Sequence, residues 1–367
     1  MRVCFFLGSL AVNGGIGRAT SMLINQISQT SDIECFLLCY CDEKKPNFYY
    51  LSEKINQSFL LTSYMSMGTL LIRSGHKRLR TYLQEKNIDL LVACGVLFFP
   101  IAVMATRGTK TRVICWEHTA PEKAQDYKAQ DFARKFGIKR SDLNVVLTKK
   151  ALRVYIEKYH AKNTIQIYNP IDTAIINNAG SYNFSSKKII SVGRLTYPKN
   201  FSMAIEVAHE VFRRFPDWQW DIFGEGEERS MLLKLISKYN LDKNVHLRGQ
   251  VDNIYDQYQH YSFMVMTSRY EGFPMSLLEG MGNRLPLISF DIATGPNEII
   301  QNGINGFLVE AGNKEKMIEV ICNLIADQEL RKRMSRENSN NVDKFSEEKI
   351  TSKWVQLFSM LSLNEDR

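Results

Sequence analysis

Short apolar segments alternate with amphipathic segments along most of the chain. In the first half the apolar segments are 2–7, 33–40, 88–93, 112–116, 143–147 and 164–168. A second series contains 188–192, 218–223, 245–248, 263–266 and 286–289. Short continuous apolar runs are typical of strands buried on both faces, and several of the intervening segments have helical periodicity. The pattern therefore predicts an α/β fold, with a parallel sheet covered by helices on both faces in each half.

Length and composition favour two folded domains. The 367 residues exceed what one ordinary core organises, and 44% apolar with 23% charged residues is typical of a folded protein rather than a disordered one. The polar stretch from Asn177 to Ser186 has no periodicity and predicts a linker or a surface loop, and helical patterns near 313–325, 327–340 and 346–361 follow the second series. Because no apolar run is long enough to span a membrane and the N-terminus enters a strand rather than a signal peptide, we expect a cytoplasmic protein.

The formal net charge of +8 is unevenly distributed. Residues 1–170 carry 24 Lys and Arg against 13 Asp and Glu, which gives +11, whereas residues 171–367 carry 23 against 26, which gives −3. Each of two basic segments, 65–86 and 123–140, predicts either a core-facing helix with a solvated basic face or a helix that attaches to an anionic membrane surface. Their basic residues include Arg73, Lys77, Arg78, Arg80, Lys128, Arg134, Lys135, Lys139 and Arg140.

The seven cysteines do not have the spacing of a metal site. Cys35, Cys39 and Cys41 are close in sequence, but paired Cys-x2-Cys or Cys/His knuckles are missing and most of the cysteines lie in apolar runs. We therefore expect buried thiols that act as small hydrophobic residues, with neither a metal nor another cofactor.

Residues 270–279 (YEGFPMSLLE) carry the most informative local pattern. They follow the apolar run 263–266, which predicts a buried strand, while Gly272 permits a tight turn and Pro274 suits the first turn of a helix. The first N–H groups of such a helix have no helical partner and form an anion site. Here they belong to Met275, Ser276 and Leu277.

Two carboxylates flank this anion site. Glu271 lies in the turn and Glu279 lies in the predicted helix, where each can accept hydrogen bonds from hydroxyl groups. A phosphate held between two such groups suits a nucleotide sugar. The alternative is that Glu271 is a charge favoured by the helix dipole and Glu279 an ordinary solvated helix residue.

Cationic side chains follow the strand at 188–192. Arg194 and Lys199 are five residues apart, between that strand and the next predicted helix, which extends to about Phe215. A guanidinium fork and an ammonium point charge in this place can clamp a diphosphate. A salt-bridged surface pair is the alternative.

Two further candidate positions follow strands of the first half. The glycine-rich segment 8–17 lies between the first strand and a helix predicted over about 18–28, and it fits neither a dinucleotide fingerprint nor a Walker loop. His118 lies just after the strand 112–116, and side chains at the carboxyl ends of strands form the binding sites of open α/β sheets. A purely structural histidine is the alternative.

Taken together, these motifs resemble those of family 4 retaining glycosyltransferases. The Glu-x7-Glu spacing of Glu271 and Glu279 and the Gly-Arg…Lys-Asn pattern over 193–200 carry the resemblance, which is strongest over about 188–310. The segment 169–172 (NPID) is similar to the family's turn between its two domains, with Pro170 in place of the usual glycine. The region 291–309 resembles enzymes that assemble bacterial surface polysaccharides, such as O-antigens and capsules.

The resemblance implies a GT-B fold, in which two Rossmann-like, doubly wound α/β domains face each other across a cleft. It implies an acceptor-binding domain over 1–170, completed by the helix within 346–367, and a donor-binding domain over 171–345. Of the catalytic residues that it implies, His118 reaches the donor sugar or its phosphate and Glu271 binds the sugar hydroxyls, while Arg194 and Lys199 meet the leaving diphosphate. It also implies that the donor is bound by Gly14, Gly15, Arg194, Lys199, Gln250, Val251, Met275, Ser276, Leu277 and Glu279, with Glu279 on the ribose.

The activity that follows is transfer of a hexose or N-acetylhexosamine, with retention and without a metal, from a UDP-linked sugar to a lipid-diphosphate-linked saccharide. The expected partners are therefore this donor, this acceptor and the anionic inner face of the plasma membrane, and not a nucleic acid. Two alternatives remain open at this point. One is an epimerase of UDP-N-acetylglucosamine with the same fold, and the other is a non-enzymatic basic protein that binds membranes or nucleic acid.

Overall fold

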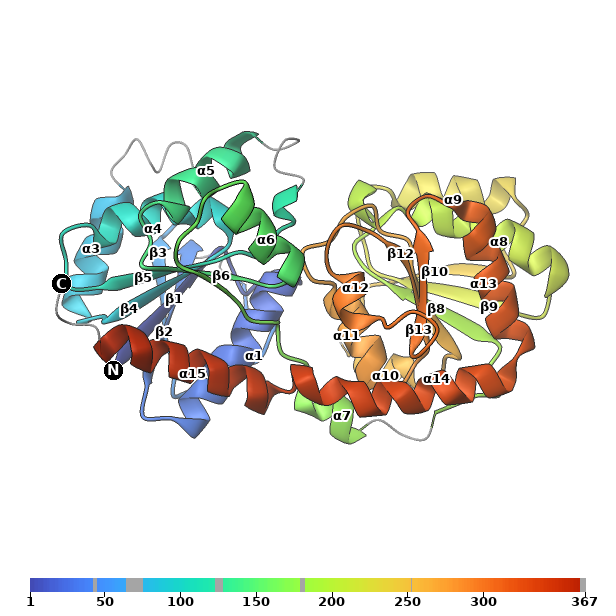
Figure 1. The fold of residues 1–367 in the computed structure, drawn as a ribbon. Helices are drawn as coiled ribbons and strands as arrows, with labels where there is room; N and C mark the ends of the chain where they lie inside the picture. The colour runs from blue at the N-terminus through green and yellow to red at the C-terminus, as the bar shows by residue number, and fades with distance from the viewer. Residues whose placement is uncertain (42–44, 64–74, 123–127, 179–181, 252, 364–367) are drawn as a thin grey trace. The chain divides into compact units, whose positions relative to one another are not determined.

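The chain in the computed structural model forms two compact units. One consists of Met1–Pro170 with Phe345–Arg367, and the other of Ile171–Lys344. The structure describes residues 1–367 except 42–44, 64–74, 123–127, 179–181, 252 and 364–367. Each unit contains a parallel sheet with helices on both faces (Figure 1). The predicted α/β fold with two doubly wound sheets is therefore confirmed.

The sheet of the first unit has the strand order β3-β2-β1-β4-β5-β6-β7 among the described residues. Its central strands, β1 and β4, pair in parallel, with Val3 opposite Leu90. The edge strand β3 is missing from the sequence-based assignment because its side chains are mostly half-buried and its apolar run is short. The strands are β1 Arg2–Leu7, β2 Glu34–Cys41, β3 Asn56–Leu61, β4 Leu90–Cys94, β5 Arg112–Trp116, β6 Leu143–Val146 and β7 Thr164–Gln166.

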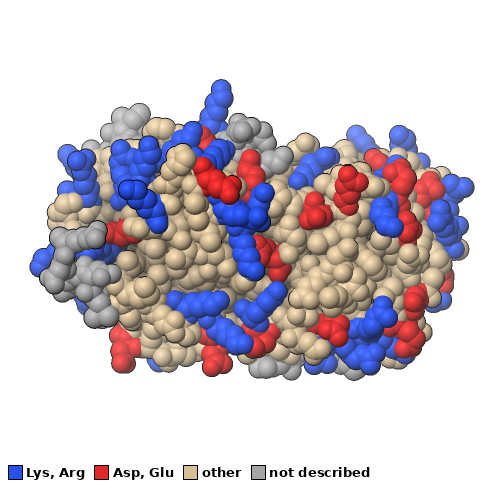
Figure 2. All heavy atoms as spheres, in the orientation of Figure 1, with Lys and Arg blue, Asp and Glu red and all other residues tan. Residues whose placement is uncertain are grey.

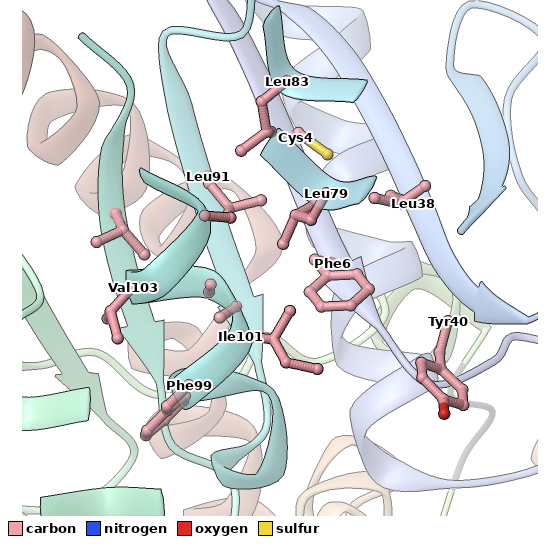
Figure 3. Packing of buried hydrophobic residues seen from close by; sticks show 14 of the residues in the cluster. Cys4, Phe6, Leu38, Tyr40, Leu79, Leu83, Leu91, Phe99, Ile101 and Val103 are labelled. Atoms are coloured by element: carbon pink, nitrogen blue, oxygen red, sulfur yellow. The ribbon is translucent and has the colours of Figure 1, made fainter. Parts of the chain in front are cut away.

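Helices cover both faces of this sheet. Cys4 and Phe6 of β1 point into the core beneath α3 and α4, where Leu79 and Ile101 lie (Figure 3). Phe5, which alternates with them, contacts Phe358 of α15 on the opposite face. The first-unit helices are α1 Gly15–Thr30, α3 Gly75–Glu85, η1 Val96–Phe98, α4 Phe99–Thr106, α5 Lys128–Ile138, α6 Lys149–Glu157 and α15 Glu347–Leu363.

The helix α15 follows the whole second unit in sequence but belongs to the core of the first. It lies alongside α1 (Figure 1). Its Trp354 packs against Trp116 at the end of β5, with 4.9 Å between ring centroids, and both indoles are fully buried. The first sheet is therefore covered on this face by a segment that is distant in sequence.

The sheet of the second unit has the strand order β10-β9-β8-β11-β12-β13 among the described residues. The chain runs outward from β8 through β9 to β10, and then continues on the other side of β8 through β11, β12 and β13. The strands are β8 Lys188–Val192, β9 Gln219–Phe223, β10 Val245–Gly249, β11 Phe263–Met266, β12 Leu287–Asp291 and β13 Gly306–Glu310.

Helices also flank the second sheet. The helix α8 packs beside α9 and α13, and α11 contacts α12 and α14. The second-unit helices are α7 Thr173–Asn178, η3 Tyr197–Lys199, α8 Phe201–Arg214, α9 Arg229–Lys238, α10 Tyr255–Tyr258, α11 Met275–Gly282, α12 Pro296–Ile299, α13 Lys314–Ala326, α14 Gln328–Asn341 and η4 Val342–Phe345. The final residue of η4, Phe345, is the residue at which the chain returns to the first unit.

The polar stretch 177–186 begins within α7, and its described residues 182–186 are bonded to the second unit rather than forming a free linker. The hydroxyl of Tyr182 donates to the carbonyl of Ser262, and the hydroxyl of Ser186 donates to the carbonyl of His260 at 2.7 Å. Both acceptors lie just before β11, so residues 182–186 are held beside the sheet.

Two arginines that were expected on basic helix faces bind groups of the protein itself. The guanidinium of Arg80 donates to the carbonyls of Met104, Ala105 and Arg107 at the end of α4, where it caps the helix. Arg134 is fully buried. Exposed basic side chains remain on α3 and α5, and Figure 2 shows lysine and arginine over this part of the surface. Arg73 lies outside the described residues.

The cysteines are free thiols, and six of the seven are buried. Their interpretation as small hydrophobic residues is confirmed. Within the described ranges, none of the helices has both the length and the apolar character needed to cross a membrane.

Candidate active site

The topology of the second sheet places two loops at its centre. The strands β8 and β11 are neighbours, but the connections after them lead to opposite sides of the sheet. Open α/β sheets bind ligands at the carboxyl ends of strands at such a switch point. Here the loops 193–200 and 267–274 follow β8 and β11, respectively.

Hydrogen bonds join these two loops directly. The hydroxyl of Thr267 donates to the carbonyl of Asn200 at 3.0 Å, and the backbone N–H of Arg269 donates to the carbonyl of Pro198 at 2.8 Å. Asn200 adopts a left-handed conformation with φ of 55°, which turns the chain sharply from η3 into α8. The side chains on both loops are therefore held in a fixed arrangement.

Lys199 and Glu271 meet across this junction. The ammonium Nζ lies 2.6 Å from Oε1 of Glu271, and the two side chains are 20% and 12% exposed. The hydroxyl of Ser268 donates to the same carboxylate oxygen at 2.7 Å. The aliphatic stem of Lys199 lies against Gly193, where an added Cβ would come within 3.3 Å of it. Lys199 and Glu271, which are distant in sequence, therefore form one site.

Arg194 lies on the same loop but has a different environment. Its side chain is exposed, and its guanidinium is not bonded or paired with another group in the part of the chain that the structure describes. Behind it, Gly224 approaches so closely that an added Cβ would lie 2.0 Å from the carbonyl oxygen of Gly193. A glycine is needed there for this contact and for its φ of +134°.

The turn that carries Glu271 is supported from the next strand. The hydroxyl of Thr294 donates to the carbonyl of Glu271 at 2.6 Å. Gly295, with φ of +98°, lies against Pro274, where an added Cβ would come within 2.5 Å of the proline ring. The loop after β12 therefore fixes the start of α11.

The N-terminus of α11 follows this turn, but only part of it matches the expectation. Met275 and Ser276 are half-buried in the first turn of the helix, and Pro274 precedes them without a side-chain cap. The N–H of Leu277 donates to the carbonyl of Pro274 at 3.1 Å, and its side chain is buried. The expectation that the Leu277 N–H lacks a partner is wrong, because the helix already closes its first hydrogen bond at this residue.

Glu279 is neither a solvated helix residue nor an open carboxylate. It is 3% exposed, and its Oε2 accepts a hydrogen bond of 2.7 Å from the hydroxyl of Tyr258. Tyr258 comes from α10 and is itself fully buried. Sequence reasoning missed Tyr258 because no local pattern connects it with α11.

Gln250 and Val251 lie at the end of β10, two strands from β8. Gln250 is exposed and Val251 is half-buried. The carbonyl of Gly249 accepts from the N–H of Gly224 at 2.8 Å, so their loop is joined to the one after β9. These residues are in the same unit as Lys199 and Glu271, but they follow β10 rather than β8 or β11, the two strands whose loops carry that pair.

In the first unit, Gly14 and Gly15 lie at the start of α1, after the central strand β1. The N–H of Gly14 donates to the hydroxyl oxygen of Tyr49 at 3.0 Å, and that hydroxyl donates to Oδ1 of Asn13 at 2.6 Å. Gly15 is exposed, and a Cβ added to Gly14 would meet nothing within 4 Å. The backbone at Gly14 is therefore open to close approach.

His118 follows β5 at the carboxyl edge of the same sheet. Its ring packs on Trp116, with 4.2 Å between centroids, and its Nε2 is buried without a hydrogen bond to any described residue. Burial lowers the pKa of His118 to about 3, although the neighbouring carboxylate of Glu117 acts in the opposite direction. The imidazole is therefore neutral at physiological pH.

A buried ion pair adjoins His118. Nε of Arg134 lies 2.7 Å from Oε2 of Glu117, and both side chains are almost fully excluded from solvent. Arg134 holds the pKa of Glu117 below its ordinary value despite the opposing effect of burial. The placement of Arg134 on a membrane-facing basic surface is therefore wrong, because its charge is used inside the unit.

None of the described residues forms a group of three or more His, Cys, Asp or Glu side chains placed to hold a metal ion. The two switch-point loops carry the charged residues Arg194, Lys199, Arg269 and Glu271.

Two doubly wound parallel sheets in one chain are the architecture of the GT-B fold, and the second sheet carries charged side chains at its switch point, among them Arg194, Lys199 and Glu271. TarM of Staphylococcus aureus, solved in complex with Fondaparinux, α-GlcNAc-glycerol and UDP, has this fold. Its TM-score is 0.82 at 17% identity, over 97% of this chain and 99% of that chain.

Sequence comparison identifies the family. A model described as Glycosyltransferase Family 4 matches residues 13–175, and a model described as Glycosyl transferases group 1 matches residues 174–341. The amylovoran biosynthesis glycosyltransferase AmsD of Erwinia amylovora is 32% identical over 256 residues, which cover 68% of this chain and 71% of that protein. An uncharacterised glycosyltransferase of Haemophilus influenzae is 25% identical over 360 residues, or 96% and 98% of the two chains. The chain therefore belongs to the family 4 glycosyltransferases.

Proposed function

We propose that this glycosyltransferase transfers a hexose or N-acetylhexosamine from a UDP-sugar to a lipid-diphosphate-linked saccharide during synthesis of a bacterial surface polysaccharide. The observation that carries the proposal is the junction of Lys199 with Glu271 beside the exposed Arg194. The similarity to a protein of amylovoran biosynthesis supports the pathway class, and a structural neighbour that binds UDP supports the nucleotide.

In this scheme Lys199 and Arg194 stabilise the nucleoside diphosphate that leaves the sugar. When the bond between the sugar and the diphosphate breaks, negative charge builds up on the phosphate oxygens. An ammonium has three N–H donors, so Lys199 can keep its bond to Glu271 and also donate to a phosphate oxygen. Arg194 adds a planar guanidinium, and the first N–H groups of α11, at Met275 and Ser276, add backbone donors. Charge stabilisation by fixed donors of this kind is the largest catalytic contribution in many enzymes.

The carboxylates act on hydroxyl groups. Glu271, held by Lys199 and Ser268, binds hydroxyls of the transferred sugar. Glu279, oriented by Tyr258, binds the ribose hydroxyls. His118 is neutral, and its unpaired Nε2 contacts the donor sugar or its phosphate. Gly14 and Gly15 lie against the donor diphosphate, and the loop with Gln250 and Val251 lies against the base.

The acceptor attacks from the face that the diphosphate leaves, and the departing phosphate takes the acceptor's proton. The anomeric configuration is therefore retained, and neither carboxylate acts as a covalent nucleophile, in contrast with retaining glycosidases. Because Lys199, Arg194 and backbone donors supply the positive charge, the reaction proceeds without a metal.

A lipid-linked acceptor stays in the bilayer, so we propose that the first unit docks on the anionic inner face of the plasma membrane. The helix α3 carries exposed Lys77 and Arg78, α5 carries exposed Lys128, and Lys139 is exposed just after α5. Phe132 on α5 is 63% exposed. Basic residues near an anionic surface contribute up to about 1 kcal/mol each. This surface excludes Arg80 and Arg134, whose guanidinium groups bind the protein itself.

The test is an assay of the purified protein with a panel of UDP- and GDP-sugars and a synthetic undecaprenyl-diphosphate sugar. Products are identified by mass spectrometry, and NMR gives the anomeric configuration of the new bond. We expect transfer from a UDP-sugar, with retention, at an unchanged rate in excess EDTA. The control is Lys187→Met, which removes an exposed ion pair with Asp217 and should transfer sugar normally.

Each part of the proposal has its own contradicting result. A preference for GDP-sugars would contradict the nucleotide, and an inverted product would contradict front-face attack. Loss of activity in EDTA with recovery in manganese would show that a metal stabilises the leaving group.

A further inference from the structure

Four buried or half-buried side chains form a hydrogen-bonded network around the segment that carries His118. We call it the Glu117 network, and its members are Glu117, Thr119, Arg134 and Tyr155. Oε2 of Glu117 accepts from Nε of Arg134 at 2.7 Å and from the hydroxyl of Tyr155 at 2.9 Å. Its Oε1 accepts from the backbone N–H of Thr119 at 3.0 Å and from the Thr119 hydroxyl at 2.6 Å.

The network joins three elements that are separate in sequence. Glu117 follows β5, Arg134 lies on α5 and Tyr155 lies on α6. Arg134 also donates from Nη2 to the hydroxyl oxygen of Thr119 at 3.0 Å, so one guanidinium holds both ends of the segment 117–119. His118 is the middle residue of that segment.

Stability alone is a weak reason for such an arrangement. Removing two charges from water costs free energy that their attraction only partly returns, and well-packed apolar residues of similar volume often stabilise a fold as well or better. A fully satisfied buried carboxylate does, however, impose a specific geometry on its donors. Here the donors are the residue that follows His118 and the two helices packed behind it.

The geometry leaves His118 little freedom. The backbone N–H and the hydroxyl of Thr119 both donate to the Glu117 carboxylate, so the residues on either side of His118 are bonded to each other. Its ring rests on Trp116, which is packed in turn against Trp354. The backbone at Glu117 is fixed as well, because its N–H donates to the carbonyl of Val145 at 2.9 Å.

We propose that the Glu117 network is a positioning device that holds His118 in the orientation needed for sugar transfer. This inference rests on the proposed contact of His118 with the donor. None of the network residues touches the substrate in this scheme. They act through His118, so disturbing them should slow turnover while UDP-sugar binding, to which Lys199, Glu271 and Glu279 of the second unit contribute most of the proposed contacts, is largely retained.

Two single-group substitutions test this with little risk to folding. Thr119→Val keeps the shape of the side chain but removes its hydroxyl, and Thr119→Ser restores that hydroxyl. Tyr155→Phe removes one hydroxyl that donates to Glu117. The matched control is Tyr159→Phe, which removes a neighbouring hydroxyl that donates to Asp131 instead. Thermal denaturation of each variant reports on the fold.

We expect Thr119→Val and Tyr155→Phe each to lower kcat by about tenfold with KM for the UDP-sugar changed less than about twofold, because small misplacements of a contacting group mainly affect turnover. Thr119→Ser should recover most of the rate, and Tyr159→Phe should transfer like the wild type. In a His118→Ala background, Thr119→Val should cause no further loss, because the residue through which it acts is gone.

The outcomes separate this inference from the proposed function. If Thr119→Val leaves kcat unchanged, or causes the same tenfold loss when His118 is already alanine, the network does not act through His118 and the inference is overturned alone. If His118→Ala itself transfers at the wild-type rate, the proposed contact of His118 with the donor is wrong, and the inference is overturned with it.

Discussion

Replacement of Lys199 by methionine should separate the proposed catalytic role of the Lys199–Glu271 pair from its structural role. Methionine keeps an aliphatic chain against Gly193 but removes the ammonium that lies 2.6 Å from Glu271. The carboxylate is not left alone by this change, because the hydroxyl of Ser268 still donates to it at 2.7 Å.

The expected loss of stability follows from the exposure of the pair. Exposed ion pairs contribute about 0.2–1 kcal/mol, whereas breaking a fully buried pair costs about 3–5 kcal/mol. Lys199 and Glu271 are 20% and 12% exposed and lie between these limits. With Ser268 still bonded to Glu271, we expect a loss of about 1 kcal/mol, which lowers Tm by about 2–4 °C for a domain of this size.

The expected loss of activity is much larger. Removal of one fixed donor from developing charge typically costs about 10²–10³ in kcat. Thermal denaturation and initial rates of UDP release, measured on the same Lys199→Met preparation, give the two quantities. Arg134→Met provides the structural contrast, since it breaks the fully buried pair with Glu117 and should lower Tm far more.

A Lys199→Met variant with near-normal turnover would refute the assignment of Lys199 to the leaving group. A Tm loss as large as that of Arg134→Met would refute the reasoning about exposure, and the lost rate would then reflect a damaged fold.

Three further predictions concern the proposed ribose site, the neutral histidine and the proposed membrane surface. Glu279→Gln and Tyr258→Phe should both weaken UDP binding in calorimetry. Glu279→Gln removes the negative charge, and Tyr258→Phe removes the hydroxyl that orients the Glu279 carboxylate. Unchanged affinity for UDP in both variants would contradict the ribose assignment. The His118 pKa of about 3 in the folded chain lies below the ordinary value of about 6.5, so the unfolded chain binds the additional proton and stability falls as pH decreases from about 6.5. Tm should therefore fall less steeply between pH 6.5 and 4.5 in His118→Gln than in the wild type, and equal slopes would show that His118 is not held neutral. Neutralising four exposed basic residues of the first unit should reduce sedimentation with phosphatidylglycerol vesicles and spare transfer to a short-chain soluble acceptor; the four are Lys77, Arg78, Lys128 and Lys139. Neutralising four exposed basic residues of the second unit should change neither result; these are Lys234, Lys243, Arg333 and Arg336.

Much of the fold could be predicted because its central strands are buried on both faces. A run such as Phe263–Met266 is apolar at every position and contrasts with the amphipathic segments around it. The edge strand Asn56–Leu61 lacks this contrast, since only one of its residues is buried. Boundaries also moved where local signals were ambiguous: α1 begins at Gly15, ahead of the expected start near Arg18, because the glycine turn is itself the beginning of the helix.

The sequence predicted several residues of the candidate site, but it did not predict the contacts between residues that are distant in sequence. Strand ends located Arg194, Lys199 and Glu271, but the bond between Lys199 and Glu271 depends on the pairing of β8 with β11. The same limit explains the errors on buried polar residues. Nothing near Arg134 in the sequence indicates that its partner is Glu117, so a basic helix suggested an exposed charge.

The helix α15 has a consequence for the order in which the protein can fold. During synthesis the first sheet emerges before the second unit, but residues 347–363, which cover one of its faces, are made only after Ile171–Lys344. At about 5–20 residues per second, that delay lasts on the order of ten to forty seconds. Throughout it Trp116 and Phe5 lack the aromatic partners they have in the finished unit. The second unit can therefore fold on the ribosome before the first unit is able to complete its core.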